Sequence, residues 1–468
     1  MQNSSVKIIY HNENAHSIVA SAGRISTTKG RSEEIYEKSC QRDDEENINL
    51  IHKILSSGHT SVMEHAFVNL AFDNVSVFVE QFMIEFRLAS FTVKSRRYVD
   101  FGKMGYIVPE FDGVSAQARD EYQKHMEYLF EEYAYFLDQG IPKEDARFVL
   151  PYGFRSNFYC TVNARELVKI VSEMVWGRGS EYPEIVMLGK SLIRQCGDKL
   201  PFLQFHKPAA VAKEDLYVPD FAAQAEKQPD MAAESMDLAV LLDGPEHPEE
   251  SICRAAVLES GLRNWRSVDV KNPSLQKAVI KKAMFSSRKR ELEQAYFTIL
   301  FQHMSLSGVT HLVRHRMQSV VIPRYLTVCD FEKYIIPDSI KKAGLTERYR
   351  SIFKKTAETS QALHAAGFAE CDQVYLLLSG LTIPVMTTMN ANELCTFIRL
   401  RTCNRAQWEI RDNALALLKL LREKHPVLFS LYGPMCYVSD VCPEGKATCG
   451  RSEEVRRMFA SGEFPEGL

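Results

Sequence analysis

Short apolar runs alternate along the chain with longer stretches whose apolar residues recur at helical spacing. Residues 66–72 form an apolar run broken only by Asn69, which predicts a strand, and residues 296–301 predict a second one. Apolar positions that recur every three or four residues predict helices over residues 119–137, 166–174, 349–363, 391–399 and 406–425. Strands and helices mixed in this way indicate an α+β fold in which a β-sheet packs against helices.

The order of predicted elements in the first half returns in the second half, together with two short sequences. Val-Asn-Ala-Arg-Glu-Leu at residues 162–167 recurs as Met-Asn-Ala-Asn-Glu-Leu at residues 389–394, a shift of 390 − 163 = 227 residues. The sequence at residues 86–90 recurs in altered form at residues 315–319, a shift of 316 − 87 = 229 residues. Two motifs in the same order with nearly the same offset predict a tandem duplication.

The length of the chain agrees with a duplication, because 468 residues suffice for two domains of ordinary size. We predict a first repeat over residues 1–206 and a second repeat over residues 236–468. Residues 207–235 are rich in alanine, proline and charged residues and have no sustained apolar period, so they predict a linker.

Composition and charge narrow the class of protein. Hydrophobic residues make up 45% and charged residues 25% of the chain, as in ordinary globular proteins. The net charge of −3 gives no global attraction to a nucleic acid polymer or an anionic membrane, and no stretch approaches the ~20 apolar residues of a membrane helix. A polar N-terminus without an export signal and an odd count of 11 cysteines predict a cytoplasmic protein with reduced thiols.

Three consecutive basic residues, Arg314, His315 and Arg316, lie in an otherwise apolar stretch of the second repeat. If that stretch is buried, its guanidinium groups need anionic partners such as carboxylate or phosphate. The alternative is an ordinary charged turn at the surface.

The first repeat contains further candidates for binding an anion. Ser95 and Arg97 combine a hydroxyl with a guanidinium, which suits a phosphorylated ligand, although a solvated basic loop has the same composition. Arg147, Asn163 and Arg165 are polar residues in apolar surroundings. The alternative for these three is helix capping by Asn163 with two surface arginines.

Two more polar residues, His59 and Glu64, precede the first predicted strand. A single histidine in this position is more often structural than catalytic, so their pattern alone predicts no site.

Four cysteines near the C-terminus predict a metal site. Cys436, Cys442 and Cys449 lie in a tail that contains glycine and proline, and Cys403 lies at the head of the helix that leads to it. Four converging thiolates would suit zinc, or an iron–sulfur cluster, and would stabilise a tail with little core of its own. Their spacing is looser than the CxxC pairs of zinc sites, which leaves free thiols as the alternative.

Taken in this order, the segments resemble the flavin-dependent thymidylate synthases. Arg314-His315-Arg316 with Ser319 is similar to the RHR signature of that family, and Gly58-His59 with Glu64-His65 is similar to its GHxxxxEH segment. The remaining similar segments are residues 95–98 (nucleotide-contacting serine and arginine), 146–151 (phosphate-contacting arginine), 161–165 (flavin-contacting Asn/Arg pair) and 400–411 (the final helix, whose arginine touches the pyrimidine). The cysteine tail is similar to that of some members.

The resemblance implies two tandem domains like the thymidylate synthase complementing proteins, and reductive methylation of a pyrimidine nucleotide such as dUMP. FAD would carry hydride, methylenetetrahydrofolate would supply the one-carbon unit, and NADPH would reduce the flavin. The implied catalytic residues are Ser95, Arg97, Arg314 and Arg401, and the implied substrate-binding residues are Ser95, Arg97, Arg147 and Arg401. The implied cofactor-binding residues are His59, Glu64, Asn163, Arg165, Arg314, His315 and Arg316.

Each repeat departs from the pattern of the family. The first repeat has Glu85-Phe86-Arg87 where the RHR signature is expected, and no clear late-helix arginine except Arg178. The second repeat carries Asn392 in place of the flavin-side arginine. Because these losses are largely complementary and members of the family are homotetramers with shared sites, we expect a homodimer that imitates a tetramer, with one intact class of composite site. The alternatives are a divergent flavoenzyme acting on another acceptor and a non-catalytic flavin or nucleotide sensor.

Overall fold

The computed structural model describes residues 3–111, 113–207, 237–439 and 441–462. The predicted linker lies outside the described residues apart from Lys207, so the predicted domain boundaries remain predictions. The chain divides into two compact units. Unit 1 contains the first repeat together with residues 336–379, and unit 2 contains the rest of the second repeat. Each unit is described by itself.

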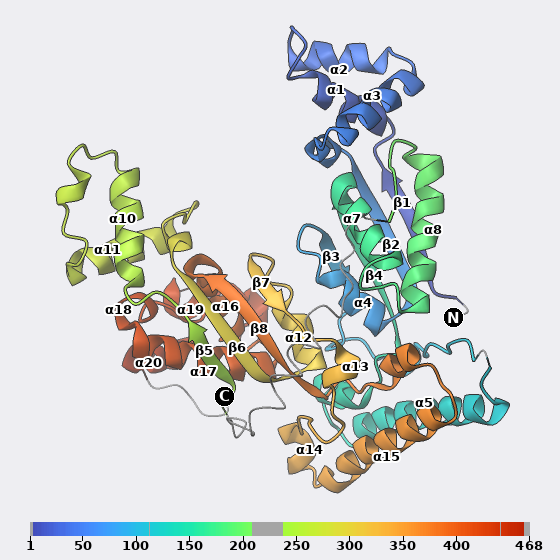
Figure 1. Ribbon diagram of the computed structural model, residues 1–468. Coiled ribbons are helices and arrows are strands. Elements are labelled where there is room, and N and C mark those ends of the chain that lie inside the picture. Colours follow the sequence, from blue (N-terminus) through green and yellow to red (C-terminus); the bar gives the residue numbers. More distant parts are fainter. Residues whose placement is uncertain (1–2, 112, 208–236, 440, 463–468) are drawn as a thin grey trace, which may run out of the picture. The chain divides into compact units, whose positions relative to one another are not determined.

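Unit 1 is built on a four-stranded antiparallel sheet with the strand order β1-β2-β4-β3. Its strands are β1 (Ser5–His11), β2 (Phe67–Ser76), β3 (Ser90–Val93) and β4 (Arg155–Asn163). Two helices, α7 (Ala164–Val175) and α8 (Pro183–Lys199), pack beside this sheet (Figure 1). The other elements of this part are α1 (Ala15–Arg24), α2 (Ser32–Cys40), α3 (Asp44–Ser56), η1 (Thr60–His65), α4 (Val77–Ile84), α6 (Lys143–Ala146) and η2 (Arg147–Val149).

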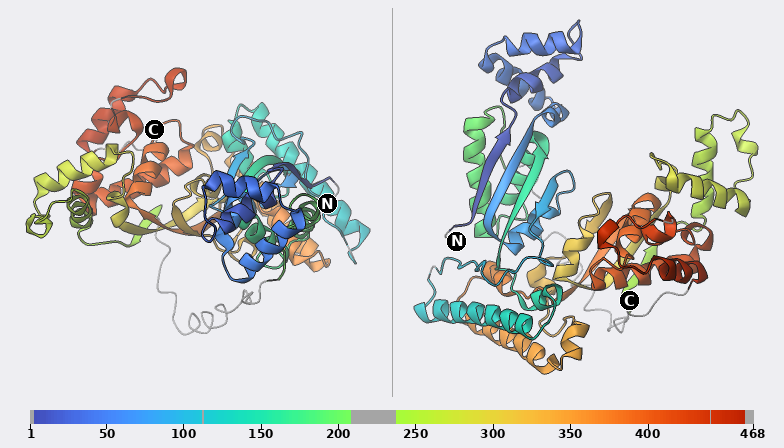
Figure 2. Two further views of the ribbon diagram at one scale, coloured as in Figure 1. Left: turned by 90° about the horizontal axis from the view of Figure 1, so that it is seen from above. Right: turned by 180° about the vertical axis from the view of Figure 1, so that it is seen from behind.

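A pair of long helices completes unit 1. Helix α5 (Ala116–Asp138) lies beside α15 (Thr346–Ala365), although α15 belongs to the second repeat (Figures 1 and 2). Arg348 of α15 donates two hydrogen bonds to the Glu132 carboxylate of α5, at 2.6 and 2.9 Å. The short elements α14 (Asp338–Lys342) and η5 (Glu370–Leu376) belong to the same part of the unit.

Unit 2 repeats the sheet of unit 1. Its strand order is β5-β6-β8-β7, again antiparallel, with β5 (Ala239–Asp243), β6 (Tyr296–Ser305), β7 (Gln318–Val321) and β8 (Thr382–Asn390). Helix α16 (Ala391–Arg401) follows β8 directly, and α17 (Trp408–Lys424) packs against α16 and β5. The other elements are α10 (Pro248–Glu259), η3 (Trp265–Ser267), α11 (Pro273–Phe285), η4 (Leu292–Gln294), α12 (Leu306–Leu312), α13 (Tyr325–Val328), α18 (Pro426–Phe429), α19 (Met435–Val438), η6 (Gly445–Ala447) and α20 (Ser452–Ser461).

The strand register confirms the tandem duplication. Phe67 of β2 lies opposite Asn163 of β4, and Tyr296 of β6 lies opposite Asn390 of β8. The register of both long strands shifts at matching positions, between Phe72 and Val75 in unit 1 and between Phe301 and Met304 in unit 2. A shared irregularity of this kind indicates that both sheets derive from one ancestral sheet.

A buried carboxylate occupies the same place in both units. Glu184 accepts a hydrogen bond from the Ser76 backbone N–H at 3.0 Å, and Glu409 accepts one from the Ser305 backbone N–H at 2.6 Å. Ser76 and Ser305 are the N-cap residues of α4 and α12. The buried carboxylates therefore fix the start of the helix that leads into the next strand in each unit.

The predicted α+β fold is confirmed, and each predicted strand and helix is present with extended or slightly shifted ends. The main differences are in β2 and β6, which continue through their bulges to Ser76 and Ser305 rather than ending near residues 72 and 301. In the described part of the chain no helix combines the length and apolar character that crossing a bilayer requires.

Asp372 in η5 is a buried acid whose effect on stability depends on pH. Burial is the main cause that raises its pKa from 3.8 to about 7, and Glu110 and Glu184 raise it further, while its Oδ1 has no hydrogen-bond partner. The native state therefore binds more protons than the unfolded state between those two values, so stability falls as pH rises across this window.

We expect the Asp372→Asn variant to lose this pH dependence, because its amide carries no charge. Its free energy of unfolding should depend less on pH between about 4 and 7, and at pH 8 it should exceed that of the wild type by an amount on the order of 2 kcal/mol. Thermal denaturation of both chains across this range checks it. If the stability of the two chains changes with pH in the same way, Asp372 ionises as freely in the folded chain as in the unfolded one.

Candidate functional site

The Arg314-His315-Arg316 segment lies in the turn between α12 and β7. His315 is only 4% exposed, whereas Arg314 and Arg316 are exposed on either side of it. The two interpretations of this segment, a buried stretch and a charged turn at the surface, are therefore each partly right. The central residue is buried, and the outer two are exposed because the chain turns there.

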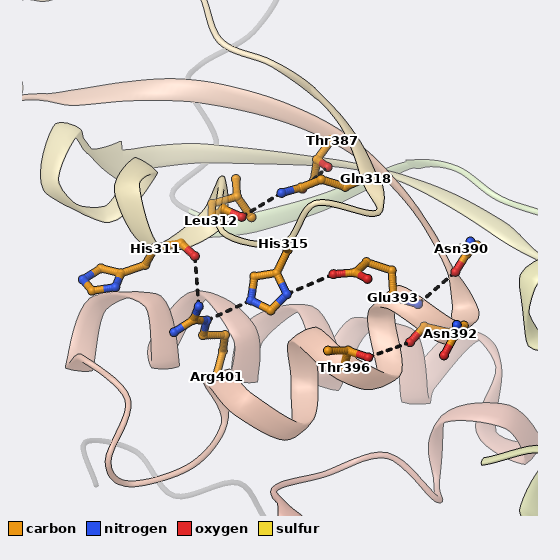
Figure 3. A network of polar contacts seen from close by, with 10 residues as sticks. All are labelled: His311, Leu312, His315, Gln318, Thr387, Asn390, Asn392, Glu393, Thr396 and Arg401. Carbon is orange, nitrogen blue, oxygen red and sulfur yellow. Dashed lines mark hydrogen bonds and ion pairs between the residues drawn. The ribbon is translucent and has the colours of Figure 1, made fainter. Parts of the chain in front are cut away.

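His315 connects two side chains of α16 (Figure 3). Its Nδ1 lies 3.0 Å from Oε1 of Glu393, and its Nε2 accepts a hydrogen bond from Nε of Arg401 at 2.9 Å. A second nitrogen of Arg401, Nη2, donates to the His311 carbonyl at 3.2 Å. Arg401 is thereby tied to the turn and to the end of α12 by two hydrogen bonds.

Helix α16 presents the partners of His315 along one stripe. Asn390 caps the helix by accepting a hydrogen bond from the Glu393 backbone N–H at 2.8 Å. Glu393, Phe397 and Arg401 then recur at intervals of four residues, which places them on one helical face. The Phe397 ring contacts the His315 ring edge-on, with 5.0 Å between centroids. Three side chains on one face of α16 therefore contact the imidazole.

Buried Gln318 closes the turn at its other end. Its Nε2 donates to the Leu312 carbonyl at 2.7 Å, and its Oε1 accepts a hydrogen bond from the Thr387 hydroxyl at 2.6 Å (Figure 3). Gln318 and Glu393 were not predicted as site residues. The signal for Glu393 was present in the sequence, because it precedes Arg401 by two helical intervals of four residues. Gln318 gives no comparable signal.

The protonation state of His315 follows from its neighbours. Burial is the main cause that lowers its pKa, the charge of Arg401 lowers it further, and the hydrogen bond to Glu393 opposes both. Because the guanidinium of Arg401 is always a donor, Nε2 of His315 must be the acceptor. The neutral ring therefore carries its proton on Nδ1, facing Glu393.

The first repeat lacks this network at the equivalent positions. Phe86 replaces His315 and Met174 replaces Arg401, and both are buried, whereas Glu166 is kept at the position of Glu393. Arg178 is not an equivalent of Arg401. It pairs with Glu85 and lies over the rings of Phe82 and Phe86, at 4.6 and 5.2 Å from their centroids.

The arginines predicted in the first repeat form two separate groups. Arg97 Nε lies 2.7 Å from the Glu144 carboxylate, and buried Arg147 donates to the Glu144 carbonyl at 3.1 Å. Glu144 thus brings Arg97 and Arg147 together, and Ser95 lies just before them with its Oγ 3.4 Å from the Arg97 backbone nitrogen. The interpretation of Arg147 as a surface residue is wrong.

The second group consists of Glu64 and Arg165, which form a half-exposed ion pair at 2.6 Å. Asn163 is the N-cap of α7 and accepts a hydrogen bond from the Glu166 backbone N–H at 2.8 Å, which confirms its capping role. His59 is exposed just before η1.

The structure does not support the predicted zinc or iron–sulfur site. Among the described residues, no three or more Cys, His, Asp or Glu side chains are arranged to hold a metal ion. The Cys442 thiol instead contacts the Thr448 hydroxyl at 3.5 Å, and the Asn404 amide donates to the sulfur of Cys449 at 3.8 Å. Burial is the main cause that raises the pKa of the Cys403 and Cys436 thiols, and the other thiols of the group add to it.

Comparison with known proteins finds the same family in both halves of the chain. The family described as "Thymidylate synthase complementing protein" matches residues 7–202 and again residues 240–427. The flavin-dependent thymidylate synthase of Geobacter sulfurreducens is 34% identical over 234 residues, covering 48% of this chain and 98% of the relative. That of Clostridium tetani is 31% identical over 255 residues, covering 49% of this chain and 100% of the relative.

One solved structure similar to part of the chain is a UMP/dUMP methylase, PolB from Streptomyces cacaoi, bound with 5-Br dUMP. It is 24% identical, covers 43% of this chain and 93% of its own, and has a TM-score of 0.36, a similarity too low to bear on fold or substrate. The evidence for the family is the double match of the family model, which covers residues 7–202 and residues 240–427. The chain therefore belongs, twice over, to the thymidylate synthase complementing protein family.

Proposed function

We propose that the chain reductively methylates a pyrimidine nucleotide such as dUMP, with FAD as hydride carrier, methylenetetrahydrofolate as one-carbon donor and NADPH as reductant. Membership of the family identifies it as a thymidylate synthase-like methyltransferase. The observation that carries the proposal is the buried contact between His315 and Arg401. It holds the late-helix arginine at the turn that bears the two exposed arginines.

The chemistry of the second repeat suits an anionic nucleotide. Arg314 and Arg316 present guanidinium groups at the surface of the turn, and guanidinium binds phosphate through paired hydrogen bonds. Arg401 keeps its proton at any physiological pH, so it can donate to a ring carbonyl and stabilise negative charge that develops on the pyrimidine. We assign Arg401 to the pyrimidine and Arg314 to the cofactor and to catalysis.

The first repeat offers a second set of phosphate ligands, and we assign Arg97 and Arg147 to a nucleotide phosphate with Ser95 beside them. Glu144 neutralises Arg97 through a partly exposed ion pair. A dianionic phosphate would compete with this carboxylate for the guanidinium, because it offers more acceptor oxygens and more charge. Phosphate binding should therefore be stronger in the Glu144→Gln variant.

The described residues also fit the anionic part of FAD. Arg165 beside Glu64 in unit 1, and separately the exposed Arg314 and Arg316 in unit 2, supply donors of the kind that a pyrophosphate requires. When bound, the flavin supplies hydride, while these side chains bind and orient it. We also propose that the chain is a homodimer in solution, so light scattering should give twice its mass of 53.4 kDa.

Flavin binding is the first test of this proposal. The purified full-length chain, titrated with FAD, should acquire the absorbance of bound flavin, and NADPH should bleach it under anaerobic conditions. Expression of the chain should also rescue a thymidine-requiring strain. A protein that stays colourless after addition of FAD contradicts the proposal, and flavin binding without NADPH oxidation or rescue would favour a sensor instead.

A further inference from the structure

The contact between Glu393 and His315 fixes the imidazole in one orientation and one protonation state. Both residues are buried, at 7% and 4% exposed, so water does not compete for the 3.0 Å contact between Oε1 and Nδ1. The contact is short enough to be classed as an ion pair, yet Arg401 needs an unprotonated Nε2 on the same ring. We therefore interpret it as a hydrogen bond from neutral His315 to the Glu393 carboxylate.

Three hydrogen-bonding groups thus act in sequence. Glu393 holds the proton on Nδ1, which leaves Nε2 as an acceptor, and that acceptor fixes Nε of Arg401 (Figure 3). Residues that do not touch the ligand but orient a group that does often matter almost as much as that group itself. We infer that Glu393 is a positioning residue for Arg401, acting through His315, in nucleotide binding. This inference rests on the proposed function.

The first repeat shows what remains when the network is lost. Glu166 has the same place in α7 that Glu393 has in α16, and the backbone N–H of each is bonded to the capping asparagine at 2.8 Å. Yet Phe86 and Met174 replace the histidine and the arginine. The helix and its cap therefore form without the network. The cap uses only the backbone N–H of Glu393, so it gives no role to the Glu393 carboxylate.

These equivalent positions supply a matched control. Glu393→Ala should weaken dUMP binding about tenfold or more, because Nδ1 loses its acceptor and the ring is free to change tautomer or turn away from Arg401. Glu166→Ala removes the same carboxylate from the same helical position and should change dUMP binding less than twofold. Glu393→Gln keeps an oxygen that accepts the Nδ1 proton, so it should restore most of the affinity.

A second measurement does not depend on activity. Nitrogen NMR of chain labelled with ¹⁵N-histidine, assigned with a His315→Gln variant, should show His315 protonated on Nδ1 in wild type, and a changed or mixed tautomer in Glu393→Ala. The inference is overturned if Glu393→Ala leaves both the tautomer and dUMP affinity unchanged, or if Glu166→Ala weakens binding equally. If wild type itself fails to bind dUMP, the proposed function fails and the role of Glu393 in nucleotide binding fails with it, whereas the NMR result still decides whether Glu393 sets the tautomer of His315.

Discussion

Replacing Arg401 with alanine should abolish measurable dUMP binding while leaving the chain folded. Arg401 is half-buried and donates to His315 and to the His311 carbonyl, so its guanidinium is fixed before any ligand arrives. A charged hydrogen bond to a ligand contributes about 1.5–3 kcal/mol, and preorganisation adds to its value, so we expect a loss of about 100-fold or more. Calorimetric titration of the flavin-loaded chain with dUMP measures it.

The control for this variant is Arg178→Ala in the first repeat. Arg178 is the arginine nearest in sequence to the equivalent helix end, but it is committed to Glu85 and to two phenylalanine rings. We expect dUMP affinity to change less than threefold in Arg178→Ala. Equal losses in both variants, or full affinity in Arg401→Ala, would contradict the assignment of the pyrimidine contact to the second repeat.

The largest effect on stability should come from Glu80→Gln in unit 1. Glu80 and Arg96 form an ion pair whose side chains are only 1% and 5% exposed, and the Ser156 hydroxyl donates to the same carboxylate. Nη1 of Arg96 has no hydrogen-bond partner, so the carboxylate is the main compensation for its buried charge. Removing one partner of a buried pair costs about 3–5 kcal/mol, which lowers the melting temperature of a domain of this size by about 10 °C.

Two further variants separate the cause from general damage to α4. Replacing both residues together, as Glu80→Met with Arg96→Met, removes the uncompensated charge and should recover much of the lost stability. Glu46→Gln breaks the exposed pair with Arg42 and should cost less than about 1 kcal/mol. A Glu80→Gln chain that melts with the wild type would mean that Arg96 finds another partner or reaches water.

The elements with a strong apolar period were the ones that could be predicted from the sequence. Helix α5 has eight buried residues along its length, and β2 is apolar over most of its length, so burial on one face decides both structures. The duplication could also be predicted, because the capping asparagines Asn163 and Asn390 lie in matching sequences at the same point after a strand.

What could not be predicted depends on contacts between residues distant in sequence. Nothing local indicates that α15 of the second repeat packs with α5, because an amphipathic helix does not specify its partner. The burial of His315 between two exposed arginines depends on Glu393, 78 residues later. The arrangement of the cysteine tail could not be predicted for the same reason, since spacing indicates which thiols could meet but not the geometry in which they do.

The most direct measurement is the product formed from dUMP. The purified chain, incubated with FAD, NADPH, methylenetetrahydrofolate and dUMP, should yield dTMP by mass spectrometry, and the Arg401→Ala chain under the same conditions should yield none above background. Flavin-loaded wild-type chain that oxidises NADPH but leaves dUMP unmethylated would contradict the proposed reaction. Undiminished dTMP formation by Arg401→Ala would contradict the site.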